Sequence, residues 1–233
     1  MNTKIADSLQ SALETIHQAA QSVNRQATEI KLLAVSKTKP AVMVEEAWQA
    51  GQRAFGENYV QEGLQKIADT RHLEDIEWHL IGPLQSNKCK PVAEHFDWVQ
   101  SVDRAKIAQR LNDNRPENLP PLNVCLQVNI SAESSKSGLS ESEVLSLADS
   151  IVQTMPRLQL RGLMAIPSNT DDVQKLCDEF QQMQQLFSQL QLSYDKVDTL
   201  SMGMSGDVAL AIAKGSTMVR IGTAIFGARS PKL

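Results

Sequence analysis

The chain has 233 residues and a hydrophobic content of 42%, which is enough to bury one sizeable core, as in a large α/β domain. Its formal net charge of -4 leaves no electrostatic footprint for nucleic acid or for an anionic membrane, so we expect neither partner. Three cysteines without CxxC spacing, no apolar leader and no window of about 18 apolar residues predict a protein of the reducing cytoplasm without a membrane span.

The first 25 residues predict an amphipathic helix that precedes the sheet. Ile5, Leu9, Leu13 and Ile16 recur at helical spacing among polar residues. We expect this leading helix, residues 1–25, to pack on the rest of the domain.

The first predicted strand covers residues 32–36 and ends beside an amine. With the period of two of a β-strand, Leu33, Val35 and Lys37 share one face, so Lys37 extends an apolar row. Loss of hydration and the nearby charge of Lys39 both favour the neutral amine, which can attack an aldehyde. The alternative, a strand-end lysine that snorkels into water, is the commoner outcome for such a stretch taken alone.

Strands and helices alternate through the rest of the chain. Eight strands favour a closed (β/α)8 barrel, which typically needs about 250 residues, over an open doubly wound sheet. The predicted fold class is therefore α/β, as one TIM-barrel domain over residues 1–233. The further strands are predicted at residues 54–56, 78–82, 98–102, 123–130, 158–166, 199–203 and 218–226, and the helices at 42–48, 60–68, 88–94, 104–114, 141–155, 171–190 and 207–214.

The strand at residues 123–130 has two different faces. Val124 and Leu126 lie on an apolar face, and Gln127 and Asn129 lie on a polar one. A polar face on a central strand suits the mouth of a barrel lumen, with the apolar face packed on the helical ring.

The ends of the last two strands carry polar and small residues, at the barrel face where chemistry is usually placed. The seventh strand runs into SMGMSGD, residues 201–207, which opens a helix whose N–H groups favour an anion. The eighth strand, VRIGTAIFG at 219–227, places Arg220 and Gly222 on one face. Together these ends predict a phosphate cup that includes Ser201, although Ser-Gly clusters alone are mostly turns.

Closure of the barrel would bring Lys37 beside Arg220 and the phosphate cup. A phosphorylated aldehyde that condenses with lysine is pyridoxal 5′-phosphate (PLP), and Arg220 could face its ring nitrogen. Because arginine stays protonated, it cannot give the pyridine a proton, and the ring remains a poor electron sink. The pattern therefore disfavours carbanion chemistry.

Six segments spread over nearly the whole chain carry a family resemblance: LLAVSKTKP, FGENYVQE, WHLIGPLQSNK, GLMAIP, LSMGMSGD and VRIGTAIFGAR. They resemble the pyridoxal phosphate homeostasis protein family. The resemblance implies a fold-type III barrel like the N-terminal domain of alanine racemase, without the C-terminal β domain. It also implies a protein that binds PLP, maintains the intracellular vitamin B6 pool and supplies cofactor to apoenzymes, without established catalytic turnover.

The same resemblance assigns the cofactor-binding residues. Lys37 would form the Schiff base with PLP, and Arg220 would be the partner of the pyridine nitrogen. Asn58 would lie beside the cofactor. The phosphate ligands implied are Ser201, Gly222 and Thr223.

Other candidates have simpler interpretations. Lys136 could be a second amine that hands PLP over, but a loop lysine is usually only solvated. The four histidines lack metal-ligand spacing, so we expect no metal, and His79 is predicted to be a hydrogen-bonded lumen residue. Glu57, at the start of the helix after the second strand, would satisfy the helix dipole as readily as it could act as a base, and Met204 is expected to serve packing.

Two alternative functions stay open beside PLP storage. A racemase-type enzyme needs a base on each face of the α-carbon, and Lys37 supplies one, while the only tyrosines are Tyr59 and Tyr194. A cofactor-free sugar-phosphate barrel with an imine-forming lysine would leave Arg220 without a clear role. For the PLP-binding function we expect a monomer.

Overall fold

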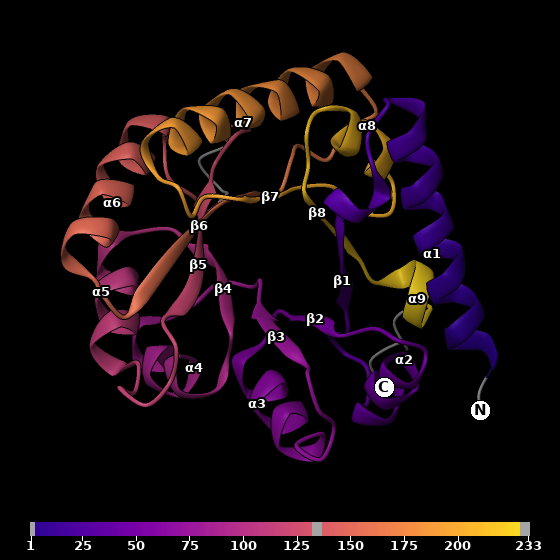
Figure 1. Cartoon of the computed structure of the whole chain (residues 1–233), viewed down its shortest axis with the longest axis horizontal. Coiled ribbons are helices and arrows are strands. Elements are labelled where there is room, and N and C mark those ends of the chain that lie inside the picture. The colour runs from indigo at the N-terminus through magenta and orange to yellow at the C-terminus, as the bar shows by residue number, and fades with distance from the viewer. Residues whose placement is uncertain (1–2, 132–136, 229–233) are drawn as a thin grey trace.

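The computed structural model describes residues 3–131 and 137–228 of the chain. Eight parallel strands follow one another in chain order around a closed ring, in which β1 pairs with β8 (Figure 1). The barrel predicted from the alternation of strands and helices is thereby confirmed. The strands are β1 (Lys31–Val35), β2 (Ala54–Glu57), β3 (Glu77–Leu80), β4 (Trp98–Val102), β5 (Leu122–Val128), β6 (Leu158–Ala165), β7 (Thr199–Ser201) and β8 (Met218–Ile221).

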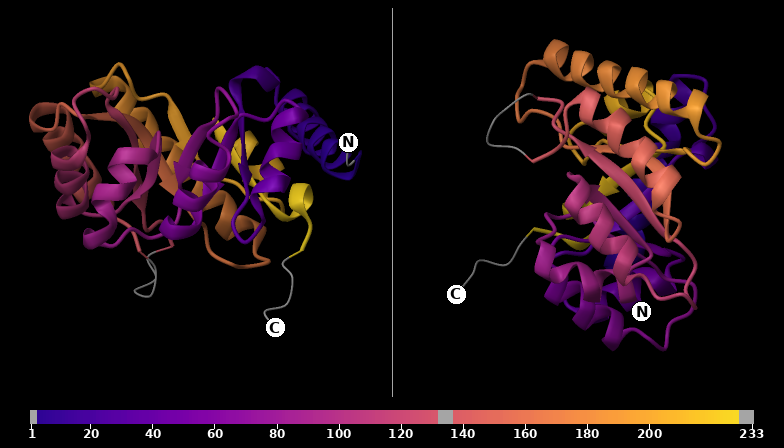
Figure 2. Two further views of the ribbon diagram at one scale, coloured as in Figure 1. Left: turned by 90° about the horizontal axis from the view of Figure 1, so that it is seen from below. Right: turned by 90° about the vertical axis from the view of Figure 1, so that its left-hand side faces the viewer.

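Helices connect the strands and surround the ring (Figures 1 and 2). Among residues 3–131 and 137–228, no helix is long and apolar enough to cross a membrane. The α-helices are α1 (Thr3–Ser22), α2 (Ala41–Gln49), α3 (Val60–Asp69), α4 (Cys89–His95), α5 (Ala105–Asn114), α6 (Glu141–Thr154), α7 (Val173–Ser193), α8 (Val208–Ala213) and α9 (Thr223–Phe226), and short 3₁₀ turns lie at Ala27–Glu29 and Ser86–Lys88.

Side-chain caps explain where the two long helices of the second half begin. The Ser140 hydroxyl accepts a hydrogen bond from the Glu143 N–H, and the Glu143 carboxylate accepts one from the Ser140 N–H at 2.8 Å. The Asp172 carboxylate accepts from the N–H groups of Gln174 and Lys175. These caps satisfy N–H groups that the first helical turn leaves without partners.

Alternate residues of each strand face the helices or the lumen. On β5, Val124 and Leu126 belong to the core between the sheet and the helical ring. Cys125 faces inward, where it packs with Trp98 and Met164. The period of two therefore sorts the faces of this strand as predicted.

The leading helix α1 lies along one side of the barrel, beside α8, α9 and α2 (Figures 1 and 2). Ile5, Leu9 and Ile16 are buried against the barrel, whereas Leu13 is 42% exposed. Arg25 links the turn after α1 to α8, because its Nη1 donates to the Ile212 carbonyl within α8 and to the Ser216 carbonyl after it. A helix at the position expected from the apolar spacing is present.

The end of β8 differs from the prediction of a strand over 218–226. The strand ends at Ile221, and the chain turns at Gly222 into α9. Ile225 and Phe226 belong to types that favour strands, but here they are buried, and α9 packs against α1. Tertiary packing thus overrides local propensity, and it leaves Gly222 and Thr223 at the mouth of the barrel.

Candidate cofactor site

A cavity of about 330 Å³ opens at the C-terminal ends of the strands. Lys37 reaches it from the segment after β1, and Arg220 reaches it from β8, the neighbouring strand across the closed seam. The volume lies within the range of about 300–1,000 Å³ typical of small-molecule sites. The other lining residues are Val35, Asn58, Ile81, Ile166, Met204, Ser205, Gly206, Gly222 and Thr223.

Lys37 lies in a tight turn. The Lys39 N–H donates to the Ser36 carbonyl at 3.1 Å, and Thr38 takes a left-handed conformation with φ of 63°. Such a conformation costs a residue with a Cβ roughly 1–2 kcal/mol, so the surrounding contacts must hold it. Ser36, on the other side of Lys37, is fully buried.

Beneath this turn lies a group of charges that we call the Lys66 cluster: Glu57 and Lys66, which are buried, and Glu62, which is partly exposed. Lys66 Nζ donates to one oxygen of Glu57 and one of Glu62, both at 2.7 Å. Burial raises the pKa of Glu57, while Lys66 and the Ser36 hydroxyl oppose that shift. The expectation that Glu57 serves the dipole of the next helix is wrong, because Glu57 is the last residue of β2 and its side chain is paired in the interior.

Arg220 is a buried cation whose guanidinium donates to neutral oxygens of β6 and β7. Its Nη1 donates to the Ser201 carbonyl at 2.8 Å and to the Ser201 hydroxyl at 2.9 Å, and Nη2 donates to the Ala165 carbonyl at 2.8 Å. Burial lowers the pKa of Arg220 to about 10, and the charge of Asp207 opposes this shift. The guanidinium therefore remains charged at pH 7.

A chain of hydrogen bonds runs from Arg220 through the lumen to the opposite end of the barrel. The Ser201 hydroxyl accepts from Arg220 and donates to Gln100 Oε1 at 2.6 Å, and Gln100 Nε2 donates to His79 Nδ1 at 2.9 Å. His79 Nε2 lies 2.6 Å from a Glu77 oxygen. Burial lowers the pKa of His79, although Glu77 opposes this, and a neutral ring lets Nδ1 accept while Nε2–H donates. His79 is thus the hydrogen-bonded lumen residue that the sequence predicts.

The residues predicted to form a phosphate cup do not all line the cavity. Ser201 does not line the cavity, since it is fully buried between Arg220 and Gln100. Ser205, four residues later, lines the cavity together with Gly222 and Thr223. Because β7 ends at Ser201, the alternation of strand faces cannot be extended to the residues beyond it.

The loop that carries Ser205 is held by Asp207. The Asp207 carboxylate accepts from the Met204 N–H at 2.5 Å, and Gly203 has a φ of 100°, which favours glycine. Met204 is 39% exposed and lines the cavity, so its predicted role in packing is wrong. Gly206 borders open space, since a Cβ there would meet nothing within 4 Å.

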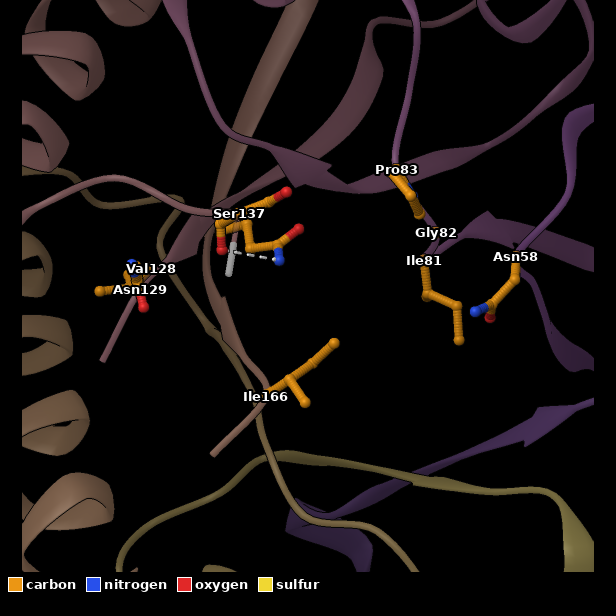
Figure 3. A pocket seen from close by; sticks show the side chains of 9 residues that line it. Asn58, Ile81, Gly82, Pro83, Val128, Asn129, Ser137 and Ile166 are labelled. Carbon is orange, nitrogen blue, oxygen red and sulfur yellow. Dashed lines mark hydrogen bonds between the residues drawn. The ribbon is translucent and has the colours of Figure 1, made fainter. Parts of the chain in front are cut away.

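Asn58 lines the Lys37 cavity and also a second cavity of about 230 Å³ (Figure 3). Asn58, Ile81 and Ile166 belong to both linings, so the two cavities adjoin at the mouth of the barrel. In Figure 3, Asn58 and Ile81 approach the space from one side and Asn129 from the other. Asn58 Oδ1 is buried without a hydrogen-bond partner among the described residues.

The structure thus brings five of the six predicted site residues to one cavity and places Ser201 behind it. Lys136 lies outside the described residues. Within the ranges 3–131 and 137–228, no group of three His, Cys, Asp or Glu side chains could hold a metal ion. The predicted residues on the cavity are Lys37, Asn58, Arg220, Gly222 and Thr223.

The lining fits PLP chemically. Lys37 offers a primary amine, and Arg220 offers a cation that can donate a hydrogen bond to a ring nitrogen but cannot readily give up its proton. Ser205 and Thr223 offer hydroxyl donors for a phosphate. A Cβ at position 222 would come within 3.0 Å of the Val35 carbonyl, so glycine permits the close approach of β1 and β8 at this point.

Comparison with known proteins first defines the class. A family model described as "Alanine racemase, N-terminal domain" matches residues 11–230. The chain therefore belongs to this class of barrel proteins. Alanine racemase from Corynebacterium glutamicum shares this fold, with a TM-score of 0.68 at 16% identity over 98% of this chain and 63% of that chain.

Closer relatives then define the family. The pyridoxal phosphate homeostasis protein of Pasteurella multocida is 57% identical over 228 residues, which cover 97% of each chain. Its counterpart in Escherichia coli K12 is 55% identical over 230 residues, again 97% of each chain. The chain belongs to the pyridoxal phosphate homeostasis protein family.

Two solved structures share the fold at higher identity. PipY of Synechococcus elongatus, solved with PLP bound, has a TM-score of 0.80 at 37% identity over 96% of this chain and all of that chain. A structure described as an unknown protein from Bifidobacterium adolescentis has a TM-score of 0.87 at 34% identity over 96% of this chain and 95% of that chain.

Proposed function

We propose that this chain binds PLP covalently through Lys37 and serves PLP homeostasis, holding the reactive cofactor and supplying it to apoenzymes in the cytoplasm. The main support for this proposal is that an amine, a guanidinium and hydroxyl donors line a single cavity. The relatives named for PLP homeostasis and the PLP complex of PipY support the same conclusion.

Each residue has a role set by its chemistry. When bound, PLP supplies an aldehyde, to whose carbon the amine of Lys37 can bond with loss of water. Arg220 would donate to the ring nitrogen, while Ser205, Gly222 and Thr223 would hold the phosphate. Asn58 would lie beside the ring and offer the carbonyl oxygen that lacks a partner among the described residues.

The visible spectrum of the purified chain tests this function. We expect an absorption band from lysine-bound PLP, and we expect borohydride to fix the cofactor on the peptide that contains Lys37. Peptide mass spectrometry locates the adduct. An adduct confined to other lysines, or a colourless protein that takes up no added PLP, would contradict the proposal.

Replacing Thr223 by Val should weaken PLP binding without changing the position of the visible band. The substitution removes a hydroxyl donor to a charged phosphate, a loss of roughly 1.5–3 kcal/mol, or about ten- to a hundredfold in affinity. Equilibrium dialysis measures it. The control is Thr15→Val on the exposed face of α1, where the hydroxyl bonds only its own helix. Equal affinities of the two variants for PLP would show that Thr223 does not bind the phosphate.

We also propose that the chain is not an amino-acid racemase. A second base opposite Lys37 is needed for racemisation, and Arg220 keeps the pyridine nitrogen unprotonated, which weakens electron withdrawal. Tyr59 is 56% exposed at the start of α3, and Tyr194 bonds Asp149 at the other end of the barrel wall. We expect no α-proton exchange of alanine in deuterated water above the rate of free PLP. Fast exchange that disappears in Lys37→Ala would establish the enzyme instead.

A further inference from the structure

A buried ammonium group lies directly beneath the turn that carries Lys37. Lys66, on α3, is 3% exposed, and its Nζ donates to the Ser36 carbonyl at 2.6 Å as well as to Glu57 and Glu62 at 2.7 Å. The three hydrogens of the ammonium group are matched by these three acceptors. Lys66 lines neither of the two cavities at the barrel mouth, so it cannot itself contact a ligand there.

The residue before Lys37 is held from two sides by this cluster. The Ser36 carbonyl accepts from Lys66, and the Ser36 hydroxyl donates to Glu57 Oε1 at 2.6 Å. The Ser36 N–H donates to the Gly56 carbonyl at 3.0 Å, which continues the pairing of β1 with β2. Every polar group of Ser36 is therefore bonded, and its backbone has one available orientation.

The residue after Lys37 is held by the same cluster. The Thr38 N–H donates to Glu62 Oε1 at 2.5 Å, the same oxygen that accepts from Lys66. Thr38 has a φ of 63°, a conformation that persists in a non-glycine residue only where contacts enforce it. Glu62 therefore fixes the direction in which the backbone leaves Lys37.

From these contacts we propose that Lys66 is a positioning residue: through Ser36 on one side and through Glu62 and Thr38 on the other, it fixes the backbone of Lys37 so that the Lys37 amine points at the aldehyde of bound PLP. The inference rests on the proposed function. Glu57 also precedes Asn58, so one cluster holds both the amine and the side chain placed beside the ring.

Stability alone does not account for such a cluster. Well-packed apolar residues often replace a buried ion pair at no cost, or with a gain in stability. An ionic cluster does supply fixed directions, because each of its hydrogen bonds constrains an angle. The turn before a reactive amine is a place where fixed direction matters, since a misplacement of 1 Å can slow a reaction by about a hundredfold.

The test compares Glu62→Ala with Glu62→Gln. Alanine removes the acceptor for Thr38 and Lys66, whereas glutamine keeps an oxygen at the same position. The Glu62 side chain is 27% exposed, so both variants should fold. One readout is the rate of capture, defined as the rate at which added PLP produces the visible band of the lysine-bound cofactor. The other is the affinity for pyridoxine 5′-phosphate, which has an alcohol in place of the aldehyde and cannot bond to Lys37.

We expect Glu62→Ala to slow capture of PLP by roughly ten- to a hundredfold, with the affinity for pyridoxine 5′-phosphate unchanged. Glu62→Gln should capture PLP at a rate close to that of the unsubstituted chain. The double variant Lys66→Met, Glu57→Gln removes a positive and a negative charge together and should slow capture as Glu62→Ala does. Its matched control is Lys90→Met, because Lys90 is exposed on α4 and pairs only along its own helix.

The outcomes separate the possible failures. Unchanged capture in Glu62→Ala and in the double variant overturns the positioning role alone. A parallel loss of capture and of pyridoxine 5′-phosphate binding also overturns it, because the cluster would then be merely structural. If the unsubstituted chain itself captures no PLP, the proposed function fails and this inference fails with it.

Discussion

Lys37→Ala should lose the visible band completely and still bind PLP, while it no longer binds pyridoxal. The phosphate group would remain held by Ser205, Gly222 and Thr223, which the substitution does not touch. Pyridoxal lacks the phosphate and depends on the covalent bond to Lys37 for its retention. Equilibrium dialysis of both ligands against the variant measures the difference.

Lys90→Ala is the matched control for this experiment. Lys90 is exposed on α4, away from the cavity, and its Nζ pairs with Glu94 along the same helix. We expect this variant to keep both the band and the affinity for pyridoxal. If Lys37→Ala bound pyridoxal and PLP equally well, the phosphate cup would not be where the structure has led us to place it.

Gly82→Ala should cost about 3 kcal/mol of stability, the upper end of what overpacking usually costs. A Cβ on Gly82 would lie 2.1 Å from the Asn58 carbonyl oxygen and 2.7 Å from two further backbone atoms of Asn58. The Gly82 carbonyl is also held by the Ser101 hydroxyl at 2.6 Å, which limits movement on that side. Asn58 must therefore shift, and the affinity for PLP should fall together with stability.

Urea denaturation with and without PLP separates these two effects. Gly206→Ala serves as the control for stability, because a Cβ there meets nothing within 4 Å. A Gly82→Ala chain as stable as the unsubstituted one would show that the β2 and β3 ends can separate at little cost.

Local patterns predicted most of the fold because each strand and helix of a barrel repeats the same simple periodicities. The prediction was wrong where tertiary packing decides the conformation. The segment from Thr223 to Phe226 has strand-forming residues, yet it becomes α9, because Ile225 and Phe226 find a buried position there. No signal within four residues reports that distant packing.

Of the residues predicted for the site, Lys37, Asn58, Arg220, Gly222 and Thr223 line one cavity, whereas Ser201 does not. Lys37 and Arg220 flank the seam between β1 and β8, and closure alone brings them together. Ser201 was assigned as a phosphate ligand from the polar end of the seventh strand and from the family resemblance, but its side chain is buried and Ser205 lines the cavity instead. The order S-x-x-x-S offered both serines, and only the course of the backbone after Ser201 distinguishes them.

Residues that act behind the cavity had no signal in the sequence. Gln100 joins His79 to Ser201 across the lumen, but it looks like an ordinary polar residue of β4. Glu57 and Lys66 are separated by only nine positions, yet their pairing depends on the direction in which α3 folds back over β2. Buried hydrogen-bond partners of this kind follow from three-dimensional packing, which one sequence does not encode locally.

The pairing of β1 with β8 can form only after β8 has been synthesised. A ribosome makes Lys37 more than 180 residues before Arg220, Gly222 and Thr223, so a nascent chain has the amine before it has the other residues of the proposed site. Until β8 pairs with β1, Arg220 and the proposed phosphate ligands do not lie beside Lys37, and only the covalent bond could hold the cofactor. A ligand present at a hundred times its dissociation constant then stabilises the finished ring by about 2.7 kcal/mol. The yield of folded chain would therefore rise with the cell's supply of PLP, and scarcity would leave more newly made barrels open at that seam.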